Sequence, residues 1–157
     1  MSKMNLIPME SFNIIGISVR TDNSDITKLT NDMQNLWNKF ISENIMGKIP
    51  NKIEHNIYCI YTDYEGDYTK PYTALLGCKV ESLDELPTGL IGKTFKSGTY
   101  NKFTAKGNLS QGVVAKQWKH IWDLNLPRSY MADFEVYGEK SQNFEDAEVD
   151  IFIGVNK

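Results

Sequence analysis

The sequence predicts an α+β fold in which a β-α-β-β module occurs twice and builds a mostly antiparallel sheet with two helices packed on it. Two segments have apolar residues at helical spacing, and several others have the alternation or the β-branched content of strands. The order strand, helix, hairpin occurs once in each half of the chain, at about residues 9–81 and 90–155. At 157 residues we interpret the chain, residues 1–157, as a single domain that can bury its own core.

Strands are predicted where β-branched and aromatic residues gather between polar turns. They are residues 12–20, 57–61, 72–80, 90–95, 99–105, 133–138 and 147–155. The acidic segment 62–71, around Glu65 and Asp67, does not have the spacing of a calcium-binding EF-hand loop, so we interpret it as a solvated turn. The last two strands, separated by a polar segment, are predicted to form an antiparallel hairpin.

Two helices are predicted from apolar residues at helical spacing. The first extends from Leu29 to about Ile45, after a polar break rich in N-cap residues, and Gly47 and Pro50 end it. The second begins after Gly112 and carries these apolar and aromatic positions: Val113, Val114, Trp118, Ile121 and Trp122. We expect the helix tryptophans to pack in the core, with the alternative that one of them caps a pocket.

Composition excludes several classes of function. The chain is 41% hydrophobic and 24% charged with a net charge of −3, and it has no Lys/Arg cluster, so direct nucleic-acid binding is not expected. Its two cysteines, Cys59 and Cys78, lie in predicted strands, and the two histidines are far apart in sequence, so neither a metal nor another cofactor is expected. No segment resembles a signal peptide or a membrane span, so we expect a cytoplasmic protein without a membrane partner.

The final hairpin places one carboxylate between aromatic residues. Alternation predicts a core face, which consists of Phe134, Val136, Val149, Ile151, Ile153 and Val155. It predicts an opposite face, which consists of Glu135, Tyr137, Glu148, Asp150 and Phe152. Glu135 is then either a solvated carboxylate or the charged group of a concave site for an organic cation or an electrophile. Partial desolvation would raise its pKa and make it a possible general base or acid.

Short matches relate the two halves of the chain. They pair 36–40 with 117–121, 58–61 with 134–137, and 75–77 with 152–154. In this alignment Cys59 takes the position of Glu135. A polar residue that breaks the symmetry of a duplicated scaffold is a candidate for a site, so Glu135 is the leading one.

Four segments occur in the order found in GyrI-like, or AraC-type effector-binding, domains. They are Asp133–Tyr137, Ala147–Val155, Ile57–Tyr64, and Phe95–Phe103 ahead of a tryptophan-bearing helix. From about Met9 to Val155 the chain resembles that family. The resemblance implies a groove between the pseudo-symmetric halves that binds small, often aromatic or cationic, molecules.

The resemblance also suggests the residues of the groove. In multidrug-sensing members a glutamate lies at the base of an aromatic pocket, and Glu135 is similar to it. Phe152 matches a position that is aromatic in such pockets. Strand parity adds Tyr137, Tyr61 and Leu75, and Trp118 is included as a tryptophan that could cap the pocket.

The resemblance leaves three functions open. The leading expectation is a stand-alone binding protein for lipophilic, aromatic or cationic small molecules, acting in sequestration or sensing. Because the resemblance begins within about ten residues of the amino terminus, no helix-turn-helix is expected before it, and regulation would need a separate protein. The alternatives are a hydrolase of cyclopropane-bearing toxins that uses Glu135 as its base, and an inhibitory partner of DNA gyrase.

Overall fold

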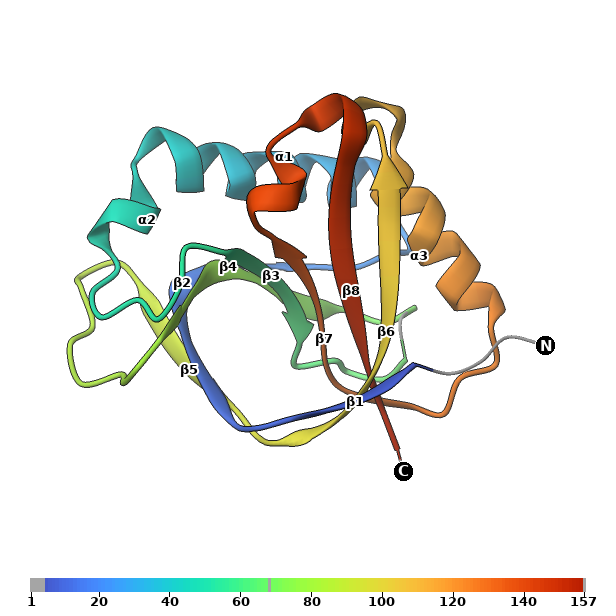
Figure 1. The fold of residues 1–157 in the computed structure, drawn as a ribbon, viewed down its shortest axis with the longest axis horizontal. Coiled ribbons are helices and arrows are strands. Elements are labelled where there is room, and N and C mark those ends of the chain that lie inside the picture. The colour runs from blue at the N-terminus through green and yellow to red at the C-terminus, as the bar shows by residue number, and fades with distance from the viewer. Residues whose placement is uncertain (1–4, 68, 157) are drawn as a thin grey trace.

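The computed structural model describes residues 5–67 and 69–156. Its strands form one eight-stranded sheet of order β1-β6-β8-β7-β3-β4-β2-β5. The strands are β1 Leu6–Met9, β2 Phe12–Thr21, β3 Ile57–Thr62, β4 Tyr72–Val80, β5 Ile91–Phe95, β6 Gly98–Gly107, β7 Arg128–Tyr137 and β8 Ala147–Val155. Neighbouring strands are antiparallel. Figure 1 shows that the sheet is strongly curled, with the long helices on its outer side. The predicted α+β fold with a mostly antiparallel sheet is confirmed.

The helices are α1 Ile26–Ser42, the short α2 Ile45–Lys48 and α3 Val113–Asp123, with 3-10 turns at Leu109–Gln111, Glu139–Ser141 and Phe144–Asp146. Asp25 caps α1 by accepting a hydrogen bond from the Lys28 backbone N–H at 3.1 Å. The prediction that this helix continues to Ile45 is wrong, because Asn44 adopts a left-handed conformation with φ 49° and separates α1 from α2. The strand β1 was not predicted from the sequence.

The two halves of the chain meet at the centre of the sheet. There β3 pairs with β7, and Cys59 lies directly opposite Glu135. On one side the order continues through β4 to β2, and on the other through β8 to β6. This arrangement is that of a duplicated module with its pseudo-two-fold axis near the Cys59–Glu135 pair, as expected from the short sequence matches.

Exchanged edge strands fasten the halves together. The first-half strand β1 pairs with β6, and the second-half strand β5 pairs with β2. The two ladders are in one continuous register, because Met9 pairs with Gly98 and Phe12 pairs with Phe95. Each half therefore contributes a strand to the other half's edge, and this exchange draws the ends of the curled sheet together.

Three apolar clusters fill the described part of the fold. The interior cluster lies on the sheet face opposite the helices and consists of Phe12, Ile14, Tyr58, Ile60, Leu75, Phe95, Tyr100, Ala132, Phe134 and Phe152. The other two clusters lie between the sheet and the helices. Leu36 and Phe40 anchor α1 in one of them, and Ile121 anchors α3 in the other. Because α1 and α3 belong to separate clusters, the central strands lie between them.

The predicted faces of the final hairpin are wrong. In the β7–β8 ladder Phe134 pairs with Phe152, and Glu135 pairs with Ile151. Directly paired residues of an antiparallel ladder share a face, so Glu135 lies with the apolar Ile151 while Phe152 lies on the other face. A shift of register by one residue exchanges the two faces of a strand. The connection between β7 and β8, with its two 3-10 turns, sets this register, and the strand patterns alone did not indicate it.

A close backbone approach between β2 and β4 leads to a test of the fold. Gly16 pairs with Gly77, and a Cβ atom on Gly16 would lie 2.1 Å from the Leu76 carbonyl oxygen. We expect Gly16→Ala to lower the free energy of unfolding by about 1–3 kcal/mol, the usual cost of overpacking, in urea unfolding followed by tryptophan fluorescence. Gly98→Ala is the control, because its Cβ would meet nothing nearer than 3.9 Å. Equal stability of the two variants would contradict this account of β2–β4 packing.

Candidate functional site

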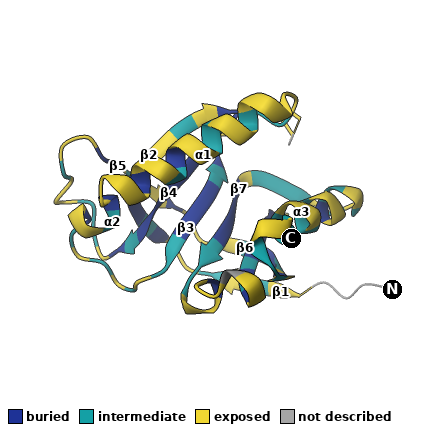
Figure 2. Ribbon diagram, turned by 90° about the horizontal axis from the view of Figure 1, so that it is seen from above, coloured by how far each residue is buried: buried dark blue, intermediate teal, exposed yellow. Residues whose placement is uncertain are grey.

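Glu135 lies near the C-terminal end of β7, on the sheet face that carries the helices. Figure 2 shows β3 and β7 running between α1 and α3. The side chain is almost completely buried, with 3% of its surface exposed. Since the residue sits at the pseudo-two-fold axis, side chains from both halves of the chain reach it.

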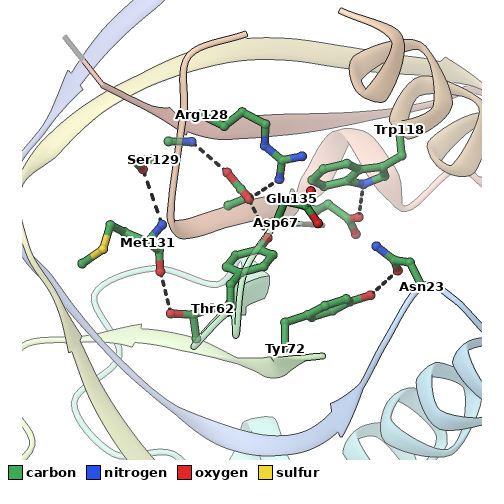
Figure 3. A network of polar contacts seen from close by, with 12 residues as sticks. Asn23, Thr62, Asp67, Tyr72, Trp118, Arg128, Ser129, Met131 and Glu135 are labelled. Carbon is green, nitrogen blue, oxygen red and sulfur yellow. Dashed lines mark hydrogen bonds and ion pairs between the residues drawn. The ribbon is translucent and has the colours of Figure 1, made fainter. Parts of the chain in front are cut away.

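Three neutral groups donate hydrogen bonds to the Glu135 carboxylate. The Tyr61 hydroxyl and the Trp118 Nε1–H reach Oε2 at 3.0 and 2.6 Å, and the Tyr137 hydroxyl reaches Oε1 at 2.6 Å. Figure 3 shows the indole of Trp118 directed from α3 at this carboxylate. Among the described residues no ion pair includes Glu135. The carboxylate is thus solvated by protein dipoles and has no cationic partner.

Aromatic rings surround the three donors. Trp37 of α1 meets Tyr137 edge-on, with ring centroids 4.9 Å apart. Tyr61 makes edge contacts with Trp118 and with Tyr72, at 5.5 and 5.6 Å. We name Glu135, Tyr61, Tyr137, Trp118, Trp37 and Tyr72 the aromatic floor. It is a buried carboxylate surrounded by aromatic side chains, the combination that recognises organic cations in proteins.

Burial determines the protonation behaviour of this cluster. It raises the pKa of Glu135, and the hydrogen bonds from Tyr137, Trp118 and Tyr61 act in the opposite direction. Burial also raises the pKa of Tyr61 and Tyr137 well above the usual range, and the nearby Glu135 charge adds to this effect. Both phenols therefore remain neutral hydrogen-bond donors at physiological pH.

A second buried carboxylate shows how Glu135 differs from an ordinary structural acid. Asp133, two residues earlier in β7, forms an ion pair with Arg128 at 2.6 Å. It also accepts hydrogen bonds from the Tyr64 hydroxyl at 2.5 Å and from the Gly154 N–H at 2.9 Å. Asp133 has a cation of the protein's own. Among the residues that the structure describes, Glu135 has no such ion pair.

The structure brings together four of the six candidate residues from the sequence: Glu135, Tyr137, Tyr61 and Trp118. The other two, Phe152 and Leu75, lie in the interior cluster on the opposite face of the sheet. Phe152 stacks on Phe134 at 4.9 Å, so its predicted position beside Glu135 is wrong for the register reason given above. The parity argument for Leu75 is wrong in the same way, because Leu75 pairs with Ile60 and not with Tyr61.

Sequence reasoning missed Tyr72 and did not place Trp37. Tyr72 begins β4 and donates a hydrogen bond to Asn23 at 2.5 Å, as Figure 3 shows. The signal that could have identified Trp37 is its repeat partner: the aligned segments 36–40 and 117–121 set Trp37 against Trp118. The two tryptophans reach the aromatic floor from different helices, Trp37 from α1 and Trp118 from α3.

Other kinds of site receive less support from the described residues. Within them, no group of three or more His, Cys, Asp or Glu side chains is arranged to hold a metal ion. None of the helices in the described part of the chain has both the length and the apolar character needed to cross a membrane.

The chain is similar to known proteins over nearly its whole length. A profile of the family described as integron-associated effector binding protein matches residues 5–155. The crystal structure of an integron cassette protein from Vibrio cholerae is 29% identical, with a TM-score of 0.76, and the match covers 98% of this chain and 95% of that one. The Bacillus subtilis protein YobU, which has a transcriptional-regulator name, is 25% identical over 145 residues, covering 90% of this chain and 91% of YobU.

A more distant structure shares the fold. SAV2435, in complex with tetraphenylphosphonium, has a TM-score of 0.78 at 15% identity, and the match covers 99% of this chain and 94% of that one. At this identity the likeness concerns the fold alone.

The buried carboxylate predicts a pH dependence of stability. In the unfolded chain Glu135 titrates near the ordinary value of 4.5, and in the folded protein its pKa is higher. Between these two values the folded state holds more protons, so stability falls as pH rises through this window and is constant above it. The stability of Glu135→Gln does not fall in this window, because an amide does not titrate. The amide can still accept hydrogen bonds from Tyr61 and Trp118 and donate one to the Tyr137 hydroxyl.

The measurement is urea unfolding of the parent and of Glu135→Gln at a series of pH values from 4 upwards. We expect the free energy of unfolding of the variant, relative to that of the parent, to increase by about 1.4 kcal/mol for each pH unit of the window. The difference in free energy of unfolding between the two proteins is free of the contribution that the other carboxylates make to the pH dependence, because both proteins share them. A difference that does not change with pH would show that Glu135 titrates normally in the folded protein.

Proposed function

The chain belongs to the integron-associated effector-binding protein family, a group of GyrI-like effector-binding domains, and on this premise we propose that it binds lipophilic organic cations on the aromatic floor, with Glu135 as their counter-charge. The observation that carries the proposal is the absence of a cation beside Glu135 among the described residues. Burying a carboxylate costs several kcal/mol unless a partner compensates it. A bound cation would supply that compensation.

The surrounding rings support a cation over a neutral ligand. A desolvated cation–π contact contributes about 2 kcal/mol, and Tyr61, Tyr137 and Trp118 all lie within hydrogen-bonding distance of the carboxylate. A diffuse, weakly hydrated cation with aromatic substituents would lose little solvation on entering such a site. An ammonium ion such as that of lysine, which is strongly hydrated, would lose more.

Ligand entry requires the aromatic floor to open. Glu135 is buried, and Trp118 donates a hydrogen bond to one of its oxygens. A cation that approaches between α1 and α3 must therefore displace the indole. The hydrogen bond lost from Trp118 is replaced by the attraction of the ligand charge. Such a displacement moves α3 relative to β7, and a separate regulatory protein could detect this movement.

The relatives support the same class of ligand. SAV2435, which shares the fold, is described with tetraphenylphosphonium, a lipophilic cation. The regulator name of YobU is consistent with a role in sensing. We include a partner protein in the proposal on that basis.

Hydrolysis of a strained electrophile is the second candidate, and one observation favours it. The raised pKa of Glu135 suits a general base, and the Tyr137 hydroxyl beside it could polarise a leaving oxygen. In that case Glu135→Gln would abolish turnover and leave binding nearly unchanged. Product analysis with a cyclopropane-bearing alkylating agent distinguishes the two functions.

We expect Glu135→Gln to weaken binding of tetraphenylphosphonium by about 2 kcal/mol or more, roughly thirty-fold in Kd, because the charge pair is lost in a desolvated site. Binding of triphenylphosphine oxide, a neutral analogue, should change by less than about threefold. Both affinities are measured by quenching of tryptophan fluorescence and by calorimetry.

The control is Glu148→Gln, which removes the same charge from the neighbouring strand β8, where Glu148 pairs with Lys106 and Lys140. This variant should bind the cation as the parent does. If the Glu135→Gln protein retains the parent's affinity for the cation, Glu135 is not the counter-charge and the proposed function fails.

A further inference from the structure

A hollow lies where β3 ends and β7 begins. Its volume is about 470 Å³, within the range of roughly 300–1,000 Å³ that small-molecule sites occupy. Four aromatic side chains line it: Tyr64, Phe95, Tyr100 and Tyr130. We name it the β3–β7 hollow.

The β3–β7 hollow is separate from the aromatic floor. Neither Glu135 nor any of its three hydrogen-bond donors lines it. Phe95, Tyr100 and Ala132 in its wall belong to the interior cluster, on the sheet face opposite Glu135. A ligand in the hollow would therefore leave the Glu135 site available to a second ligand.

A strained bulge forms one wall of the hollow. The β7–β8 register shifts between Arg128 and Asp133, and within this bulge Tyr130 has φ 54°, a conformation that costs energy for any residue but glycine. Such strain persists where the surroundings enforce it, commonly at binding sites. The Thr62 hydroxyl holds the bulge by donating to the Met131 carbonyl oxygen at 2.7 Å, as Figure 3 shows.

The ring of Tyr130 is held in place on two sides. The Arg128 guanidinium carbon lies 4.4 Å from its centroid, and Tyr64 meets it edge-on at 5.5 Å. Arg128 is itself fixed by the buried ion pair with Asp133. A preorganised ring loses little entropy when a planar ligand packs against it.

The charge around the hollow is positive, although the protein is acidic. Lys93 and Lys96 line it together with one carboxylate, Asp63, which gives a local charge of +1 against −3 for the chain. Asp63 is paired with Lys93 at 2.6 Å, and among the described residues no ion pair includes Lys96.

A second hollow, lined by residues of β1, β2 and β4, has the opposite balance. It contains Glu10, Glu54 and Glu81 against a single cation, Lys79. The positive charge is therefore a property of the β3–β7 hollow that this second hollow does not share.

We propose that the β3–β7 hollow binds a planar aromatic anion, such as an aromatic carboxylate or sulfonate. The ring system packs against Tyr130, and the anionic group lies at Lys96 with Lys93 beside it. This site is independent of the cation site, so the protein holds two ligands of opposite charge at once.

The test uses 1-anilinonaphthalene-8-sulfonate, an aromatic anion with a planar naphthalene ring whose fluorescence rises on binding, titrated into the intact chain at low salt. Lys96→Glu reverses the charge at the hollow, and Tyr130→Gly removes the ring while favouring the left-handed backbone. We expect each variant to raise the Kd at least about tenfold, the size of a lost ion pair or aromatic contact in a desolvated site. Lys48→Glu, with the same charge change at an exposed position of α2, should change it by less than about twofold.

Competition provides the second part of the test. Saturating tetraphenylphosphonium should leave the stoichiometry of the anionic dye unchanged, since the two ligands occupy different faces of the sheet. Loss of the dye on addition of the cation would place both in one site and overturn the proposal. The proposal would also be overturned if Lys96→Glu and Tyr130→Gly left the Kd of the dye unchanged. It would equally be overturned if the parent protein did not bind the dye. These variant results do not depend on whether the cation binds at Glu135.

Discussion

The architecture of the site depends on the hydrogen bonds that three neutral donors make to the buried carboxylate of Glu135. Tyr61 comes from the first half of the chain, and Trp118 and Tyr137 from the second. Their convergence requires the β3–β7 pairing at the centre of the sheet. Helices α1 and α3 must also flank this pair, and each does so through its own apolar cluster.

Duplication of the module explains why this site is buried and why it is asymmetric. Two copies of one module meet at a pseudo-two-fold axis, where both helices can cover the same pair of strands. At the axis itself one copy contributes Cys59 and the other Glu135. Cys59 behaves as a small buried residue, and burial together with the Glu135 charge raises the pKa of its thiol. Glu135 therefore has the enclosure that two halves provide, and the residue opposite it in the β3–β7 ladder, Cys59, is not an acid.

Much of the fold could be predicted from the sequence because its elements have strong local patterns. Apolar spacing around Leu36 and Phe40 identified α1, although a left-handed Asn44 ends the helix earlier than the apolar pattern does. The alternating segment 147–155 identified β8. Glu135 was identified as the asymmetric position of the repeat, and Trp118 as a candidate lid.

The errors about strand faces have one physical source. Which face a strand residue occupies depends on register, and register is fixed by turns and bulges that the strand patterns do not report. Phe152 and Leu75 were therefore assigned to the wrong side of the sheet, where they fill the interior cluster with Phe134. The strand patterns also did not indicate the bulge at Tyr130 or the hollow beside it. In this bulge several consecutive residues of β7 lie opposite fewer residues of β8.

The most direct test of the central claim is the number of protons released when a lipophilic cation binds. Calorimetric titration with tetraphenylphosphonium in two buffers of different ionisation enthalpy, at a pH between 4.5 and the folded pKa of Glu135, measures it. If the cation is the counter-charge of Glu135, binding favours the ionised carboxylate and releases a proton, and Glu135→Gln releases none. Binding by the parent without proton release, or with release that survives the substitution, would contradict the account.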